Sequence, residues 1–106
     1  MSQKNMGRLA QDMKREIIAI IGRLKDPRLE GGLLTVTRLD VTPDLDVAKV
    51  YVSVMGRADG PKPAIEALNR AAGHVRTAVS KKMPIRKAPR FIFVEAAGAA
   101  YAAHIN

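Results

Sequence analysis

Residues 63–84 hold the feature that most constrains the fold, an apolar repeat at every third or fourth position with a glycine near its middle. The apolar positions are Ile65, Leu68, Ala72, Val75, Val79 and Met83. This spacing places them on one face of a helix, with Pro63 near its start and Pro84 at its end. Because glycine inside a helix costs about 1 kcal/mol relative to alanine, we expect two helices that meet at a bend at Ala71-Ala72-Gly73.

The same part of the chain concentrates positive charge. Residues 61–90 contain eight Lys and Arg residues against one acid, Glu66, and so hold +7 of the net charge of +8. A localised basic surface is typical of a protein that binds a polyanion, although a solvated basic face gives the same pattern. The candidate RNA-binding residues are Arg70, His74, Arg76, Lys81, Lys82, Arg86, Lys87 and Arg90.

Length and composition limit the classes of protein. With 106 residues, of which 47% are hydrophobic, we expect a single domain over residues 1–106, with its core at about 5–95 and a C-terminal tail at 96–106. The chain has no cysteine, which excludes a thiolate nucleophile and a disulfide framework. No apolar run approaches the ~20 residues that span a bilayer, and the polar start MSQKNMGR is unlike a signal peptide. We expect a cytoplasmic monomer that does not associate with membranes.

A first amphipathic helix is predicted at residues 5–25. Its apolar positions again recur at helical spacing: Met6, Leu9, Ala10, Met13, Ile17, Ile20, Ile21 and Leu24. Such a helix could lie on a membrane surface, but its mixed charges and lack of an aromatic anchor favour packing on a sheet. Asp26-Pro27 ends it, because the residue before a proline disfavours the helical conformation.

Three segments have the period-two alternation of strands. Residues 33–41 and 48–54 alternate apolar and polar positions on either side of the turn Thr42-Pro43-Asp44, which predicts an antiparallel hairpin. Residues 90–95 are a third strand. The order α-β-β-α-α-β predicts an α+β fold, a three-stranded sheet covered by helices.

Two helices that meet at small residues between two strands are also the arrangement of a KH domain. In an ordinary KH domain a Gly-x-x-Gly loop at this junction clamps the nucleotide backbone. Here the junction is Ala71-Ala72-Gly73, whose missing side chains would allow close approach of RNA or of a neighbouring strand. The spacing does not distinguish these two interpretations.

The sequence offers no arrangement of catalytic residues. The phosphate-loop pattern is absent from residues 56–62, and neither His74 nor His104 has a partner at metal-ligand spacing. The hairpin acids Asp40, Asp44 and Asp46 could hold a hard cation, but aspartate is common in turns for other reasons. We expect no enzymatic activity, no cofactor and no metal.

Over roughly residues 5–95 the chain resembles the ribosome-binding factor A family of bacterial small-subunit assembly factors. Four features in order make the resemblance specific. They are Lys25-Asp26-Pro27-Arg28-Leu29 after the first helix, the hairpin 33–54 with Asp44-Leu45-Asp46, the junction Ala71-x-Gly73 followed by Val75-Arg76, and Ile85-Arg86-x-x-Pro89-x-Phe91-x-Phe93.

The resemblance implies a KH-like (type II) domain with an Ala-x-Gly helix kink and no catalytic activity. It also implies binding to the free small (30S) ribosomal subunit and its 16S ribosomal RNA, near the 5′-terminal helix of that RNA. The implied role is late maturation and 5′-end processing of 16S RNA, growth in the cold, and release by a ribosome-associated GTPase. Two other classes stay open, a general KH-type protein that binds messenger or small RNA and an RNA-processing enzyme.

Overall fold

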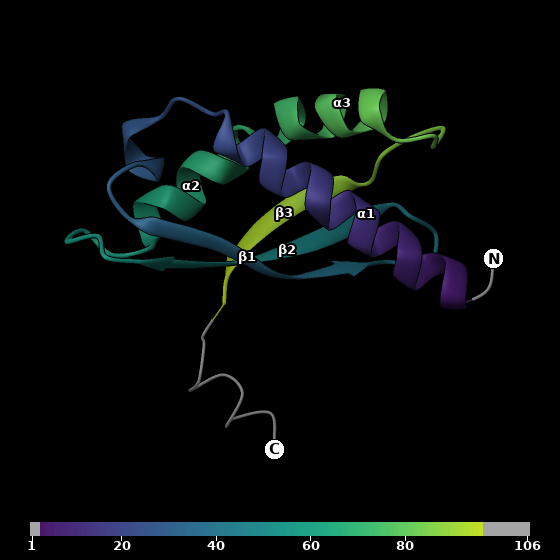
Figure 1. Cartoon of the computed structure of the whole chain (residues 1–106), viewed down its shortest axis with the longest axis horizontal. Coiled ribbons are helices and arrows are strands. Elements are labelled where there is room, and N and C mark those ends of the chain that lie inside the picture. Colours follow the sequence, from purple (N-terminus) through teal and green to yellow (C-terminus); the bar gives the residue numbers. More distant parts are fainter. Residues whose placement is uncertain (1–2, 97–106) are drawn as a thin grey trace, which may run out of the picture.

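A three-stranded sheet forms one layer of the fold, and the helices pack on one of its faces (Figure 1). The structure is a computed structural model that describes residues 3–96. The elements are α1 (Gln3–Gly22), the short 3-10 helix η1 (Pro27–Leu29), β1 (Leu33–Val41), β2 (Val47–Met55), α2 (Lys62–Arg70), α3 (Ala72–Lys82) and β3 (Arg90–Glu95). The α+β class and the order α-β-β-α-α-β of a KH-like (type II) fold are therefore confirmed, with η1 as an addition.

The strands are ordered β1-β2-β3. β1 and β2 form the expected antiparallel hairpin, from Leu33 opposite Met55 to Val41 opposite Ala48. β3 runs parallel to β2, and a parallel neighbour needs a crossover connection. The α2–α3 pair supplies this connection and is thereby laid across the sheet.

A bulge in β1 keeps its apolar side chains on the covered face. The register shifts between Val36 and Arg38, so that Thr37 is the extra residue and Leu39 lies opposite the buried Val50. Without the extra residue, the strand's period of two would turn Leu39 and Val41 toward the other face.

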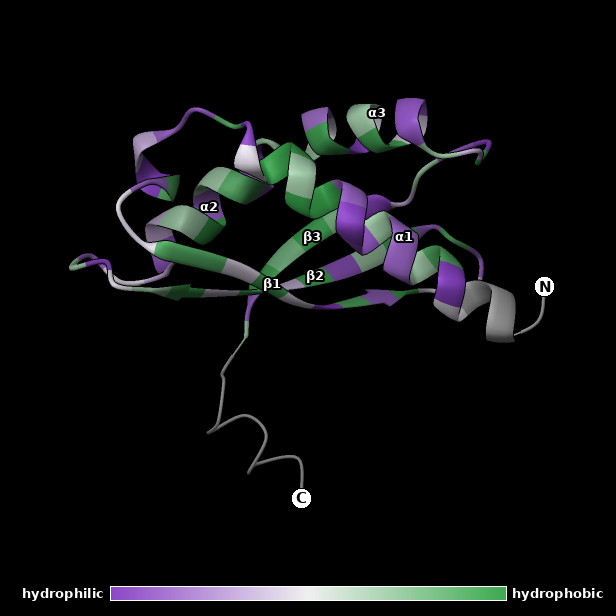
Figure 2. Ribbon diagram, viewed as in Figure 1, coloured by the Kyte–Doolittle hydropathy of each residue, from purple (hydrophilic) through white to green (hydrophobic). Residues whose placement is uncertain are grey.

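The core lies between the sheet and the helices, and hydrophobic residues recur along both layers in Figure 2. Its members come from every helix and strand that the sequence predicts. They include Met13, Ile17, Ile20 and Ile21 of α1, Val50 and Val52 of β2, Leu68 of α2, Val75 and Val79 of α3, and Phe91 and Phe93 of β3. The apolar spacing thus identified the faces that pack together.

α1 ends at Gly22, earlier than the expected residue 25. The N–H groups of Arg23 and Leu24 bond three residues back, to the carbonyls of Ile20 and Ile21, at 3.0 Å. This tightened final turn leads into Asp26-Pro27, where a helix could not continue. No helix in the described part of the chain is long and apolar enough to cross a membrane.

The kink between α2 and α3 is centred on Ala71, whose φ and ψ are −87° and 0°. Its N–H lies 3.1 Å from the carbonyls of both Ala67 and Leu68. Gly73 is exposed inside α3, and a Cβ added there would meet nothing within 4 Å. Gly73 therefore does not make room for a neighbouring strand.

The expected tail at 96–106 lies, apart from Ala96, outside the described residues. The Ala96 N–H donates to the carbonyl of Val52 at 2.8 Å and so extends the β2–β3 pairing by one residue.

Candidate RNA-binding surface

α3 separates apolar from basic side chains. Val75 and Val79 are fully buried against the sheet, whereas His74, Lys81 and Lys82 are exposed. His74 and Lys81 are seven residues apart, about two helical turns and roughly 10 Å along the axis, and so share a face. α3 therefore presents an exposed basic face across its length.

Arg76 does not belong to this exposed face. It is half-buried, and its Nε donates to the carbonyl of Ala88 at 3.0 Å. This bond ties α3 to the segment that connects it to β3. Of the eight candidate residues, Arg76 is the one with a visible structural role.

The connector between α3 and β3, residues 83–89, buries apolar side chains at both of its ends and exposes basic side chains to solvent. Met83, Ala88 and Pro89 are buried, while Arg86 and Lys87 are exposed. Buried anchors on both sides fix the backbone that carries these two cations. Arg90 follows, also exposed, and its N–H donates to the carbonyl of Asp46 at 2.9 Å.

The hairpin turn lies beside this connector. A surface hollow of about 430 Å³ separates them, lined by Asp44 and Asp46 on one side and by Arg86 and Lys87 on the other. The carboxylate of Asp44 accepts hydrogen bonds from the Thr42 hydroxyl at 2.7 Å and the Asp46 N–H at 3.0 Å. These hydrogen bonds lower the pKa of Asp44 below its usual 3.8, and the bond from Thr42 contributes most.

Two of the three hairpin acids, Asp40 and Asp44, have local side-chain partners. Asp40 forms an ion pair with Arg38 at 2.8 Å, and Asp44 stabilises the turn as described. Within residues 3–96, no group of three or more His, Cys, Asp or Glu side chains is placed to hold a metal ion. The contacts of Asp40 and Asp44 therefore stabilise the hairpin.

Arg70 and His74 flank the α2–α3 kink at the other end of α3, and both are exposed. The pKa of Asp26 is lowered chiefly by hydrogen bonds from the side chain and N–H of Arg28, and to a smaller extent by the charge of Arg70. α2, which ends at Arg70, also packs against η1. Apart from Arg76, the candidates fall into two groups, one at the kink and one at the connector, joined by the exposed face of α3.

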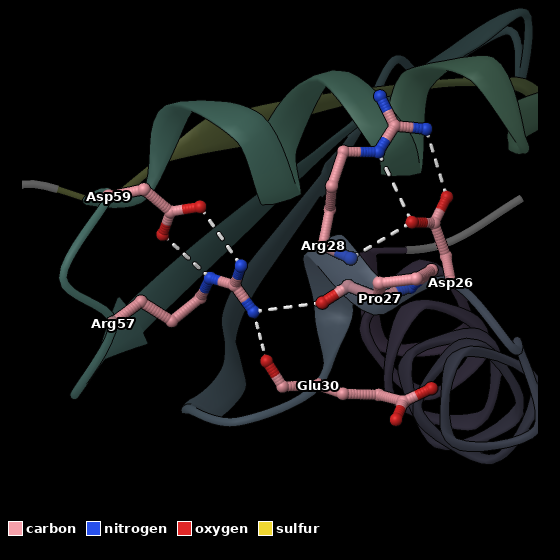
Figure 3. A network of polar contacts seen from close by, with 6 residues as sticks. All are labelled: Asp26, Pro27, Arg28, Glu30, Arg57 and Asp59. Atoms are coloured by element: carbon pink, nitrogen blue, oxygen red, sulfur yellow. Dashed lines mark hydrogen bonds and ion pairs between the residues drawn. The ribbon is translucent and has the colours of Figure 1, made fainter.

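A network of polar contacts around η1 was not anticipated (Figure 3). Asp26 accepts a bidentate pair from the Arg28 side chain at 3.1 and 2.9 Å. Arg57 donates to Asp59 at 2.8 and 2.9 Å, to the carbonyl of Pro27 at 3.0 Å, and to the carbonyl of Glu30. Arg57 thereby fastens η1 to the loop between β2 and α2, across 30 positions of sequence.

Asn69 is a second residue that the sequence did not single out. Its Nδ2 donates to the carbonyl of Phe93 at 2.9 Å, and its Oδ1 accepts from the Phe93 N–H at 2.8 Å. One helix side chain therefore occupies both backbone groups of Phe93 at the free edge of β3. A polar residue in a helix gives no sequence signal for such a role.

Comparison with known proteins identifies the family. The profile of ribosome-binding factor A matches residues 5–106. A ribosome-binding factor A of Desulfitobacterium hafniense (strain DSM 10664 / DCB-2) is 42% identical over 106 residues, covering 99% of this chain and 83% of that protein.

Solved structures agree. The crystal structure of ribosome-binding factor A from Thermus thermophilus superposes with a TM-score of 0.75 at 31% identity, over 84% of this chain and 92% of that one. A homology model of the Thermus thermophilus factor, fitted into the cryo-EM map of a 30S–RbfA complex, matches with a TM-score of 0.70 at 32% identity, over 86% and 94% of the two chains. The chain belongs to the ribosome-binding factor A family.

Proposed function

We propose that this protein is a ribosome assembly factor that binds the free 30S subunit and assists late maturation and 5′-end processing of 16S ribosomal RNA. The observation that carries the proposal is that α3 has two different faces. One face buries Val75 and Val79 against the sheet, and the other exposes Lys81 and Lys82 to solvent. A relative fitted into a 30S complex supports the choice of partner.

The proposed contacts are phosphate contacts. Lys81, Lys82, Arg86 and Lys87 are exposed on neighbouring segments held by buried anchors, and fixed cations of this kind neutralise backbone phosphates and release counterions. Arg70, His74 and Arg90 extend the surface toward the kink and β3. Arg76 acts in this proposal by holding the connector rather than by touching RNA.

Gly73 adds an independent argument. Glycine is unfavourable in a helix, yet the space around Gly73 is open and its φ is not in the left-handed region. The fold itself thus gives no steric reason for glycine here. An RNA backbone that approaches closely between Arg70 and His74 would give such a reason, because a side chain at position 73 would block it.

The proposed role is binding rather than catalysis. Within residues 3–96, the shifted pKa values belong to Asp26, Asp44 and Asp59 with their local partners, and to Arg28 and Arg57 in the ion pairs of the η1 network. Each shift follows from a contact that shapes a turn or loop. Release by a ribosome-associated GTPase completes the proposal.

Sucrose-gradient fractionation of a cell lysate tests this function. The protein should co-migrate with free small subunits and be depleted from assembled ribosomes. Cells that lack it should accumulate 16S RNA with an unprocessed 5′ end. A profile confined to the top of the gradient, or association with messenger RNA alone, would instead favour a general KH-type RNA-binding protein.

A further inference from the structure

Exposed apolar side chains gather at the edge of the molecule formed by α1 and β1. In the part of the chain that the structure describes, the large hydrophobic residues with substantial exposure are Ile18 at 47%, Leu33 at 65% and Met55 at 63%. Single exposed apolar residues are ordinary, and Met55 lies on the central strand β2, but Ile18 and Leu33 line the same hollow. An exposed hollow lined by apolar side chains is a candidate interaction site.

The hollow is an apolar groove of about 390 Å³ between the second half of α1 and the start of β1. Its apolar lining comes from Ile18, Ile21, Leu24, Leu29, Leu33 and Leu34. A second hollow of about 280 Å³ shares Ile18 and continues along α1 to Lys14 and Arg15. Together they make a trough that is apolar at one end and basic at the other.

The two edges of the sheet differ. At the β3 edge Asn69 occupies the N–H and carbonyl of Phe93. Along β1, a strand of nine residues, no other strand within residues 3–96 pairs on the side away from β2. An edge strand presents alternate N–H and C=O groups outward, ready to pair with another strand.

The wall of the groove is held in place before any partner arrives. Arg57 bonds the carbonyls of Pro27 and Glu30 on either side of Leu29. Gly32 packs so closely that an added Cβ would lie 2.6 Å from Arg57 Cγ. A site held in its bound shape loses less conformational freedom on binding.

We propose that β1 and this trough bind an extended peptide segment of a protein partner, which adds to the sheet as a further strand. A bulky apolar residue of the peptide fills the groove beside Ile18, and a carboxylate two positions away reaches Lys14 and Arg15. The spacing fits, because one helical turn between Lys14 and Ile18 rises about 6 Å and same-face residues of a strand lie about 6.6–7 Å apart. This is recognition by strand addition with a side-chain pocket.

The site lies apart from the proposed RNA surface. α1 packs on β1 and also contacts α3, but none of the residues that line the two hollows is among the eight candidate RNA-binding residues. A chain with both surfaces can hold RNA and a protein segment at the same time. The inference therefore goes beyond the proposed function and does not depend on it.

The test uses the full chain and a synthetic acetylated peptide, Thr-Glu-Val-Leu-Val-Thr, in NMR titrations and fluorescence anisotropy. The backbone amides of β1 and the second half of α1 should shift and the β1 amides should gain protection from hydrogen exchange. Ile18→Lys should weaken binding at least about tenfold, as for an anchor contact. The control Met55→Lys, at a more exposed apolar residue outside the groove, should change the affinity less than about twofold.

Changes to the peptide separate the contributions. Lysine in place of its glutamate, or proline in place of the valine before leucine, should each weaken binding. The proposal is overturned if β1 amides do not respond, if both variants lose binding equally, or if a uridine hexamer perturbs the same amides while the peptide does not. It is also overturned if sedimentation shows a dimer that Ile18→Lys abolishes, since a second copy would then fill the groove.

Discussion

Two glycines with opposite surroundings, Gly73 and Gly32, give the sharpest prediction. Gly73 lies in α3 with nothing within 4 Å of an added Cβ, whereas a Cβ on Gly32 would lie 2.6 Å from Arg57 Cγ and 2.8 Å from the Met55 carbonyl oxygen. Gly73→Ala should raise the free energy of unfolding by about 0.4–1 kcal/mol, because alanine has fewer conformations to lose on folding. Gly32→Ala should lower it by about 1–3 kcal/mol through crowding.

Urea denaturation followed by circular dichroism measures both changes, and binding to purified small subunits is measured on the same preparations. If RNA approaches Gly73, the Gly73→Ala protein should be more stable and bind more weakly, while Gly32→Ala should bind normally at temperatures where it is folded. A destabilised Gly73→Ala protein would refute the account of the kink. A stabilised protein with full binding would refute the contact at Gly73.

Three further predictions concern the fold. Phe93 is 1% exposed, so Phe93→Ala should cost about 3–5 kcal/mol in a urea melt, and an unchanged midpoint would contradict its place in the core. Asn69→Ala should remove both bonds to Phe93, cost about 0.5–1.5 kcal/mol per bond, and increase self-association in sedimentation by freeing the β3 edge. In the folded protein the pKa of Asp26 is lowered from 3.8. The ionised carboxylate therefore stabilises the fold above pH 3.8, and this stabilisation is lost as the pH falls through the pKa of the folded state. Asp26→Asn should therefore be less stable than wild type at neutral pH, with the difference vanishing in acid.

The sequence predicted the elements because their apolar spacing is local information. The apolar repeat in residues 63–84 predicted which side of α3 is buried. The alternation of apolar and polar residues on either side of Val50 predicted which face of the sheet is covered. The candidate basic residues of this region do not belong to the apolar repeat and should therefore face solvent. All of them are exposed except Arg76. The exception, Arg76, bonds a carbonyl twelve residues away.

The features that sequence did not predict depend on distant partners. The parallel pairing of β3 with β2 and the contact of Arg57 with Pro27 join segments far apart in the chain. The bulge at Thr37 follows from matching β1 to β2 rather than from any residue signal in β1 alone. The open trough beside Ile18 likewise exists only once α1, η1 and β1 are assembled.

The central claim is that the exposed cations of α3 and the connector bind ribosomal RNA. Two variants test it, each of which removes four charges from the net +8. One changes Lys81, Lys82, Arg86 and Lys87 to glutamine. The control changes four exposed cations on or just after α1 to glutamine, namely Arg8, Arg15, Arg23 and Lys25.

The most direct measurement is the salt dependence of binding to purified small subunits. Each phosphate contact contributes about −0.7 to −0.9 to the slope of log affinity against log salt concentration. The α3–connector variant should therefore show a slope shallower by roughly 3 if all four cations touch phosphate, with weaker binding at low salt and an unchanged circular dichroism spectrum. The control should keep the wild-type slope. Equal loss in both variants, or an unchanged slope in the first, would contradict the assignment of this surface to RNA.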